Sequence, residues 1–275
     1  MRIRTAVIPV AGKGTRFQPV TKAVAKELLP LVDTPTLHHI VLEAANSGIE
    51  KIVLVTSKGK SSIEDYFDSD LNDEVLKKIQ IVSIRQKNPR GLGHAVLTAK
   101  PLVENEPFAV LLGDDVIVNK GRPCIGQLMD VFEKRNGSPV VGIMEVPASE
   151  THKYGIVSGQ RVDDHTILLD KLVEKPAAGQ APSQFAIPGR YILTPDVFPI
   201  LENAQPGAGG EIQLTDALQA LAKKRELFAF QFQGRRFDAG DRFGYLEANI
   251  YFALQREDTR ESTEKLIKRL AKELL

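Results

Sequence analysis

The chain has 275 residues, of which 43% are hydrophobic and 26% are charged, values that are ordinary for a globular protein. Its 36 Lys and Arg against 35 Asp and Glu leave a formal net charge of +1, so no overall field directs it to nucleic acid or to a membrane surface. The single cysteine, Cys124, excludes an intramolecular disulfide and a cysteine-built metal site, and we interpret it as a buried core residue. Because the chain has no apolar run of ~20 residues and no signal peptide, we expect a cytoplasmic protein.

Apolar runs and helical patterns alternate along the first 150 residues. The predicted strands cover residues 5–10, 51–56, 79–85, 107–112 and 139–146. The predicted helices between them cover residues 35–47, 60–67, 93–104 and 122–136. This alternation predicts an α/β fold with a Rossmann-like, mostly parallel sheet that is flanked by helices. Ligands in such sheets bind beyond the carboxyl ends of the strands.

After residue 150 the pattern changes to short alternating segments separated by turn residues. Residues 154–158, 166–174 and 185–193 predict antiparallel strands that make the sheet mixed. A helix is predicted at 213–224 and a last strand at 227–233.

The C-terminal residues 241–275 predict two helices. In the second helix, apolar residues fall on one face at helical spacing: Leu266, Ile267, Leu270 and Leu274. This stripe favours packing against the rest of the chain, with a contact to a second subunit as the alternative. We therefore divide the chain into a main domain, 1–240, and a helical segment, 241–275.

A glycine loop follows the first predicted strand, in the segment AGKGTRFQPVTKAVAKELLP from Ala11 to Pro30. Glycines allow backbone N–H groups to approach a phosphate chain, and cationic side chains neutralise its charge. The loop carries four such cations: Lys13, Arg16, Lys22 and Lys26. Phe17 stands where a Rossmann fingerprint needs a small residue, and Gly12-Lys13-Gly14 is no Walker A loop. The segment predicts a phosphate-binding loop of another kind.

Two carboxylates, Asp114 and Asp115, end a buried predicted strand. An unpaired carboxylate in a buried strand is costly, so these acids need water, a helix N-terminus or a cation. With a nucleotide nearby, oxygen ligands favour Mg²⁺. A simple Gly-Asp-Asp turn is the alternative, and a second acid at a strand end, Asp238, favours the metal site over the turn.

Two other strand ends carry polar residues that can reach a ligand. Glu174 and Lys175 close one strand, although a solvent-exposed ion pair is the alternative there. Gln86 ends another strand, and its amide can donate to and accept from a uracil edge at once.

Taken together, Gly-x-Gly-Thr-Arg, Pro-x-Thr-Lys and Lys-Glu-x-Leu-Pro resemble the signature of the sugar-phosphate nucleotidylyltransferases. The version in this chain is similar to that of the bacterial uridylyltransferases, which use UTP and glucose 1-phosphate. Further matching segments follow in the family's order, so the resemblance extends from about residue 3 to residue 255.

The resemblance also implies roles for individual residues. Asp114 and Asp238 would hold one Mg²⁺, and the sugar contacts would come from Asp115, Gly155 and Glu174. The nucleotide contacts would come from Ala11, Gly12, Gly14, Thr15, Gln86 and Gly91. The catalytic cations would be Arg16, Lys26 and Lys175. The five histidines form no metal-like set, and we interpret them as ordinary surface or helix residues: His38, His39, His94, His152 and His165.

The reaction that the resemblance implies is attack by glucose 1-phosphate on UTP, giving UDP-glucose and pyrophosphate. A thymidylyltransferase that uses dTTP is one alternative, because uracil and thymine differ by a methyl group that a pocket discriminates by only ~1–3 kcal/mol. A catalytically silent paralogue that binds a nucleotide sugar is another. A homo-oligomer, dimer or tetramer, is expected.

Overall fold

The computed structural model describes residues 2–69, 71 and 73–274, and within them ten strands form one large sheet. Its strands are β1 (Thr5–Pro9), β4 (Lys51–Thr56), β5 (Gln80–Arg85), β6 (Phe108–Leu111), β8 (Val140–Glu145), β9 (Gly155–Arg161), β10 (Thr166–Glu174), β11 (Phe185–Ile187), β12 (Arg190–Leu193) and β13 (Phe228–Gln231). Two small two-stranded sheets pair β2 (Pro30–Leu31) with β3 (Thr34–Pro35), and β7 (Asp115–Val118) with β14 (Arg235–Asp238).

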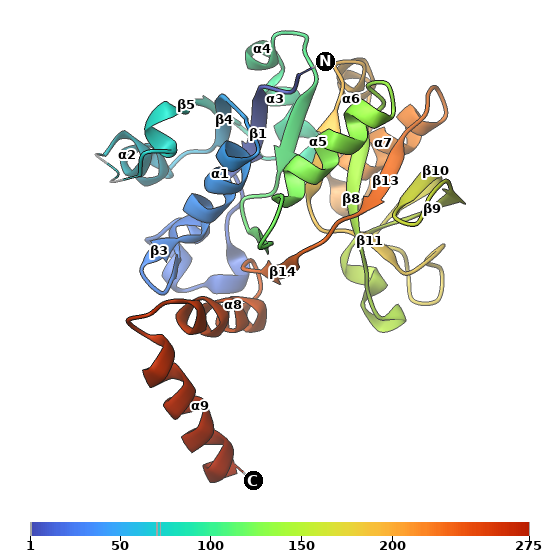
Figure 1. Ribbon diagram of the computed structural model, residues 1–275. Helices are drawn as coiled ribbons and strands as arrows, with labels where there is room; N and C mark the ends of the chain where they lie inside the picture. Colours follow the sequence, from blue (N-terminus) through green and yellow to red (C-terminus); the bar gives the residue numbers. More distant parts are fainter. Residues whose placement is uncertain (1, 70, 72, 275) are drawn as a thin grey trace.

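The large sheet has the order β11–β9–β10–β13–β8–β12–β6–β1–β4–β5 (Figure 1). From β6 to β5 its strands pair in parallel. Strand β12 then pairs antiparallel with both β6 and β8, and β9, β10 and β11 continue antiparallel. The α/β class and the mixed sheet between helices are confirmed.

Helices cover both faces of the sheet. They are α1 (Thr36–Asn46), α2 (Ser61–Asp68), α3 (Leu92–Thr98), α4 (Lys100–Val103), α5 (Cys124–Lys134), α6 (Val197–Glu202), α7 (Leu214–Ala222), α8 (Arg242–Gln255) and α9 (Arg260–Leu274). Buried residues of α1, α2, α5 and α8 belong to one apolar core, and those of α3, α4, α6 and α7 to the other.

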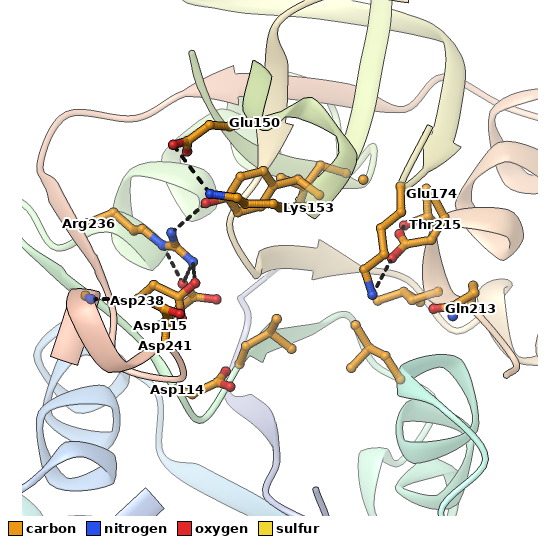
Figure 2. Close-up of a pocket in the computed structure, with 18 of the residues that line it drawn as sticks. Asp114, Asp115, Glu150, Lys153, Glu174, Gln213, Thr215, Arg236, Asp238 and Asp241 are labelled. Atoms are coloured by element: carbon orange, nitrogen blue, oxygen red, sulfur yellow. Dashed lines mark hydrogen bonds and ion pairs between the residues drawn. The ribbon is translucent and has the colours of Figure 1, made fainter. Parts of the chain in front are cut away.

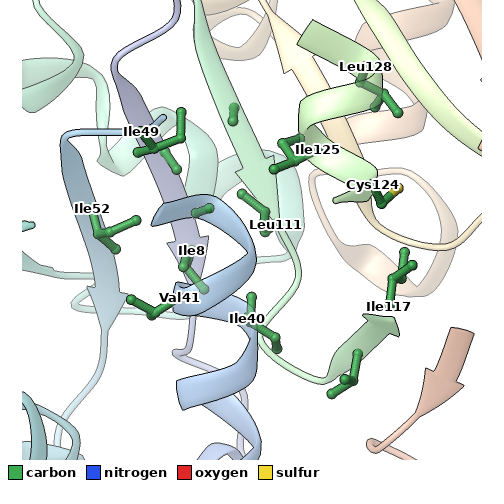
Figure 3. Packing of buried hydrophobic residues seen from close by; sticks show 14 of the residues in the cluster. Ile8, Ile40, Val41, Ile49, Ile52, Leu111, Ile117, Cys124, Ile125 and Leu128 are labelled. Atoms are coloured by element: carbon green, nitrogen blue, oxygen red, sulfur yellow. The ribbon is translucent and has the colours of Figure 1, made fainter. Parts of the chain in front are cut away.

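Strand β1 shows why its sequence is apolar at every position. Ala6 and Ile8 belong to the core under α1 and α5, where Figure 3 shows Ile8, whereas Val7 belongs to the opposite core. All three side chains are fully buried, and burial of a side chain the size of Val7 or Ile8 stabilises the fold by about 1.5–3 kcal/mol. Cys124 lies in the same core as Ile8, so its interpretation as a buried core residue is confirmed.

Several predicted boundaries are corrected by the structure. The strand predicted over 185–193 is two strands, because Pro188 and a left-handed Gly189 (φ 97°) interrupt it. The helix predicted over 93–104 is divided into α3 and α4 at the junction before Pro101. The short strand β7 and the helix α6 were not predicted, and of β14 only its end at Asp238 was.

The two C-terminal helices differ in what they contact. Helix α8 packs on the body: Ala248 is fully buried, and Asn249 Oδ1 accepts a hydrogen bond from Val32 N at 2.9 Å. Helix α9 extends away from the body (Figure 1), and within its described residues none is buried. The expectation that the apolar stripe of this helix packs against the rest of the chain is therefore wrong.

Among the described residues, no helix combines the length and the apolar composition that a bilayer span requires. The division into 1–240 and 241–275 and the cytoplasmic location stay predictions.

A fully buried ion pair joins the sheet to two helices. The guanidinium of Arg190, on β12, donates from Nη2 to Glu43 Oε2 on α1 at 2.7 Å. The same Nη2 donates to the backbone carbonyl of Asp115 at 2.6 Å, and Glu43 Oε1 accepts from Ile125 N, in the first turn of α5, at 3.0 Å. Buried charges are tolerated when they are paired and hydrogen-bonded in this way.

We predict that Glu43→Gln lowers the free energy of unfolding by ~3–5 kcal/mol, because it leaves the buried Arg190 charge without its partner. Urea unfolding followed by circular dichroism measures the change. Asp130→Asn is the matched control, since it removes an exposed partner of Arg122 at 2.9 Å and should cost less than ~1 kcal/mol. Equal, small losses in both variants would contradict the structural role of the buried pair.

Candidate active site

The glycine loop follows β1 at the carboxyl edge of the parallel strands. Gly14 has a left-handed backbone (φ 63°), and its carbonyl accepts a hydrogen bond from Thr21 Oγ1 at 2.7 Å. A Cβ at Gly14 would lie 3.0 Å from the Thr21 side chain and 3.2 Å from that of Lys26. Glycine is therefore needed here, because the turn brings the loop close to the segment that carries Lys26.

A buried ion pair next to this loop holds its two ends, at Val10 and Glu27, together. Lys60 Nζ donates to Glu27 Oε2 at 2.7 Å and to the backbone carbonyl of Val10 at 2.5 Å. Glu27 is only 1% exposed, and burial raises its pKa against the opposing effect of Lys60. Sequence reasoning did not find this pair, because the two residues are far apart in the sequence and no local pattern links them.

Lys26 and Asp114 are brought into direct contact. Lys26 Nζ donates a hydrogen bond to Asp114 Oδ2, which joins the glycine loop to the end of β6. Burial alone would lower the pKa of Lys26, but the carboxylates of Asp114 and Glu27 raise it above its ordinary value. Burial would likewise raise the pKa of Asp114, and Lys26 instead holds it below its usual range. Both groups are therefore charged at neutral pH.

The small sheet of β7 and β14 brings the second acidic segment to the first. Asp238 pairs in register with Asp115, although 122 residues separate them in the sequence. Asp114 and Asp238 then enclose Gly240: a Cβ there would lie 2.5 Å from Asp114 Oδ2 and 3.2 Å from Asp238 Oδ1. The two carboxylates thus form a cradle that is open only because residue 240 is glycine.

Arg236 sits at the centre of this acidic group. Its guanidinium donates to Asp115 Oδ1, lies 3.2 Å from Asp238 Oδ2, and donates to the Tyr154 hydroxyl at 3.0 Å. Burial raises the pKa of Asp115 to about 7 against the opposing effect of Arg236. Sequence reasoning missed Arg236, whose only signal was its position two residues before an expected metal ligand.

The aspartates form one wall of a cavity, and the end of β10 forms the wall that faces them. Glu174 Oε2 accepts a hydrogen bond from Thr215 Oγ1, on α7, at 2.6 Å. A Cβ at Gly155, the β9 residue paired with Glu174, would lie 2.9 Å from that hydroxyl oxygen. Lys175 adopts a left-handed backbone (φ 43°), which ends the strand alternation and allows both Glu174 and Lys175 to line the cavity. Figure 2 shows Asp114, Asp115 and Asp238 on one side and Glu174 and Thr215 on the other.

The predicted residues line two adjoining cavities, of about 600 and 440 Å³. Asp114 contributes to the walls of both. The larger one also contains Arg16, Asp115, Gly155, Glu174, Lys175 and Asp238. The smaller one also contains Ala11, Gly12, Lys26, Gln86 and Gly91. Of the predicted residues, all of which the structure describes, Gly14 and Thr15 belong to neither lining.

The donor set at the cradle suits a divalent cation of the Mg²⁺ type. Within the described residues no three His, Cys, Asp or Glu side chains converge as metal ligands, so protein side chains alone would not complete the shell of an ion here. Mg²⁺ commonly takes one or two protein carboxylates and completes its shell with phosphate oxygens and water. The two carboxylates around Gly240 fit this requirement.

Comparisons with known proteins agree with the geometry. The family model described as nucleotidyl transferase matches residues 5–254. The chain belongs to this family. It is 46% identical to the UTP–glucose-1-phosphate uridylyltransferase of Staphylococcus epidermidis, over 98% of this chain and 99% of that protein. It is also 46% identical to the enzyme of the same name from Bacillus subtilis, over 94% of each chain.

Solved structures give the same family relation. A UDP-glucose pyrophosphorylase complexed with UDP-glucose superposes with a TM-score of 0.89 at 40% identity, covering 93% of this chain and all of that one. A UTP-bound enzyme of this kind from Acinetobacter baumannii gives a TM-score of 0.88 at 35% identity, over 98% of this chain and all of that one. The resemblance found in the sequence motifs is therefore confirmed over nearly the whole chain.

Proposed function

We propose that this nucleotidyl transferase transfers uridylyl from UTP to glucose 1-phosphate, releasing UDP-glucose and pyrophosphate. The observation that carries the proposal is the pair of adjoining cavities with Asp114 in their shared wall. A cationic glycine loop lies at the smaller cavity, and acceptors for a sugar lie across the larger one. The names of the relatives at 46% identity agree with this activity.

The smaller cavity takes the nucleotide. Backbone N–H groups at Ala11 and Gly12 face the phosphates, and Gln86 and Gly91 take the base. Gly14 and Thr15 act by shaping the loop, since neither lines a cavity.

The larger cavity takes glucose 1-phosphate. Glu174 and the small residue Gly155 receive the sugar, with Asp115 on the facing wall. The Lys175 ammonium, 3.6 Å from Glu174 Oε1, holds the sugar's phosphate. Glu174 is a charged acceptor for sugar hydroxyls, and its orientation is fixed by the Thr215 hydroxyl.

Asp114 and Asp238 are the residues that would hold Mg²⁺. When bound, the ion supplies positive charge next to the reacting phosphate oxygens. Lys26 already supplies a positive charge to Asp114, and Arg236 supplies one to Asp238.

The reaction is an in-line displacement. A phosphate oxygen of glucose 1-phosphate bonds to the α-phosphorus of UTP, and the bond from that phosphorus to the bridging oxygen of pyrophosphate breaks. The attacking oxygen is anionic at neutral pH, so the step needs no general base. Arg16 and Lys26 stabilise the triphosphate and the departing pyrophosphate, while Lys175 holds the attacking group. Catalysis then rests on alignment and on charge neutralisation.

We predict pyrophosphate release with glucose 1-phosphate and Mg²⁺ that prefers UTP over dTTP, ATP, CTP and GTP. The enzyme-coupled release assay measures the rate with each nucleotide, and EDTA should abolish it. Comparable rates with dTTP would move the assignment toward a thymidylyltransferase. No release with any nucleotide, from folded protein, would favour the silent paralogue over the proposed enzyme.

We predict that Lys175→Ala lowers kcat/KM for glucose 1-phosphate by ~10²-fold or more, because the attacking phosphate loses its positioning charge. Steady-state kinetics at saturating UTP measures the change. Lys171→Ala is the matched control, since this exposed lysine lies on the same strand outside the cavity. Turnover near that of the unmodified protein would remove Lys175 from the mechanism.

We infer that the apolar stripe of α9 packs against a second copy of the chain. Its four members are 40% to 84% exposed: Leu266, Ile267, Leu270 and Leu274. Lysines, arginines and glutamates surround the stripe, so two copies can pair their apolar faces and their opposite charges together. The exposure of all four apolar residues on one face of α9 supports this inference.

We predict that the unmodified chain has a solution mass of at least twice the 30.3 kDa of one chain, measured by light scattering after gel filtration. Leu266→Glu with Leu270→Glu should reduce that mass toward one chain, because like charges then face each other. Lys265→Gln with Lys272→Gln serves as the control on the same helix. A single-chain mass for the unmodified protein at micromolar concentration would refute the assignment.

A further inference from the structure

Helix α8 lies next to the glycine loop and contacts it through its first turn (Figure 1). Arg242, the first residue of the helix, donates a hydrogen bond from Nε to the backbone carbonyl of Arg16 at 2.8 Å. The Tyr245 ring meets the Phe17 ring edge-on, with the ring centroids 5.5 Å apart and the planes at 81°. The Tyr245 hydroxyl donates to the backbone carbonyl of Pro30 at 2.6 Å. Tyr245 therefore joins the middle of the loop to its end.

The contacts between α8 and this part of the chain continue beyond the first turn. Asn249 Oδ1 accepts from Val32 N at 2.9 Å, and Arg256, directly after the helix, lies 2.5 Å from Asp33 Oδ1 through its Nη1. The helix has a firm position of its own, because Ala248 is fully buried in the core. Helix α8 is thus a fixed support for residues 16–33.

The two cations that the proposed function places at the triphosphate, Arg16 and Lys26, are fixed in different ways. Lys26 Nζ is bonded to Asp114. The guanidinium of Arg16 is exposed, and among the described residues none pairs with it by a hydrogen bond or an ion pair. Arg16 lies in a single 3₁₀ turn, Thr15–Phe17, whose hydrogen-bond geometry alone gives little stability. Its position therefore depends on what holds its backbone, and α8 contacts that backbone directly.

The start of α8 also carries a charge opposite to that of Arg16. Asp241 caps the helix, accepting from the backbone N–H groups of Phe243 at 3.0 Å and Gly244 at 3.3 Å. Burial would raise the pKa of Asp241, but these N–H groups and the charge of Arg16 hold it below its ordinary value. Asp241 and Arg16 line the same cavity. The free guanidinium thus has a carboxylate near it in the cavity wall.

The same turn connects α8 to the carboxylate cradle. Asp241 N donates to the Asp238 carbonyl at 3.2 Å, and Tyr245 N donates to the Asp241 carbonyl at 2.8 Å. A Cβ at Gly244 would lie 2.4 Å from the Asp238 carbonyl oxygen, so the helix starts as close to the cradle as glycine allows. The position of Arg16 is in this way tied to that of Asp238.

We propose that Tyr245 is a positioning residue that clamps the glycine loop to α8 and thereby sets Arg16 at the triphosphate. Its ring holds the residue that follows Arg16, and its hydroxyl holds the end of the loop. The effect on the rate rests on the proposed use of UTP. The clamp itself is a property of the loop and is measurable without any reaction.

Three variants test the clamp. Tyr245→Leu removes both contacts and keeps an apolar side chain, whereas Tyr245→Phe keeps the ring and loses only the hydroxyl. Tyr251→Phe is the matched control on the same helix. The Tyr251 ring packs against Phe237 at 4.8 Å, and within the described residues its hydroxyl has no hydrogen-bond partner. Thermal unfolding checks that each variant is folded.

We expect Tyr245→Leu to lower kcat/KM for UTP by ~10-fold or more, since an aromatic contact and a hydrogen bond to the loop are lost together. Tyr245→Phe should lie between this variant and the unmodified protein, and Tyr251→Phe should match the unmodified protein. Pyrophosphate release at saturating glucose 1-phosphate measures the change. Equal rates in Tyr245→Leu and Tyr251→Phe would overturn the proposal.

A double-mutant cycle with Arg16→Ala separates positioning from a general structural role. If Tyr245 acts through Arg16, adding Tyr245→Leu to Arg16→Ala should change kcat/KM for UTP by less than ~2-fold. A loss by the same factor in both backgrounds would show that Tyr245 supports the fold independently of Arg16, and it would overturn the positioning role.

Limited digestion with trypsin measures the clamp without a reaction. The loop offers exposed cleavage sites after Arg16 and Lys22, and exposed lysines of α9, Lys265 and Lys268, serve as the internal reference. We expect loop cleavage, followed by mass spectrometry, to be ~10-fold faster in Tyr245→Leu and reference cleavage to be unchanged. Faster loop cleavage in a protein that releases no pyrophosphate would support the clamp and contradict the proposed reaction. Equal loop cleavage in Tyr245→Leu and the unmodified protein would overturn the clamp.

Discussion

The ion pair of Arg190 and Glu43 connects the packing of the fold to the geometry of the site. Both side chains are buried, and their charges are satisfied by each other and by backbone groups. One of those backbone groups is the carbonyl of Asp115, directly after Asp114. The turn that carries the two carboxylates is therefore held from inside the protein by its backbone, while its side chains contact Lys26 and Arg236 in the cavity wall.

Around that fixed turn, two cations compensate the charges of three aspartates. Lys26 is bonded to Asp114, and Arg236 is bonded to Asp115 and lies near Asp238. Charges that are close together in a site of low dielectric need such compensation. Under the proposed function, the same cations would also face the phosphate oxygens of a bound nucleotide.

The sequence predicted those parts of the structure that leave a local signal. The strands of the parallel half, the glycine loop and the acids at strand ends follow from apolar runs, glycine spacing and charge at the end of a run. The small sheet of β7 and β14 was not predictable, because its strands have four residues each and pair over more than a hundred positions. For the same reason the contact between Arg236 and Asp115 could not be foreseen.

Two other features of the structure, the contact of His94 and the exposed stripe on α9, were not predicted, and each has its own physical reason. His94 lies on a helix as expected, but a histidine in a helix gives no sign that its ring meets Gln86. The stripe on α9 was recognised, but amphipathic periodicity specifies that a face is apolar and not what covers it. Tertiary partners, and not secondary structure, were therefore the harder part to predict.

The wall of the larger cavity comes from residues between Arg16 and Glu247, and therefore from most of the length of the chain. Such a cavity exists only in the folded chain, so a ligand that fills it binds the native state and not the unfolded one. By mass action, a ligand at 100 times its dissociation constant adds about 2.7 kcal/mol to the free energy of unfolding. The supply of substrate thus also determines how long the protein resists unfolding and proteolysis.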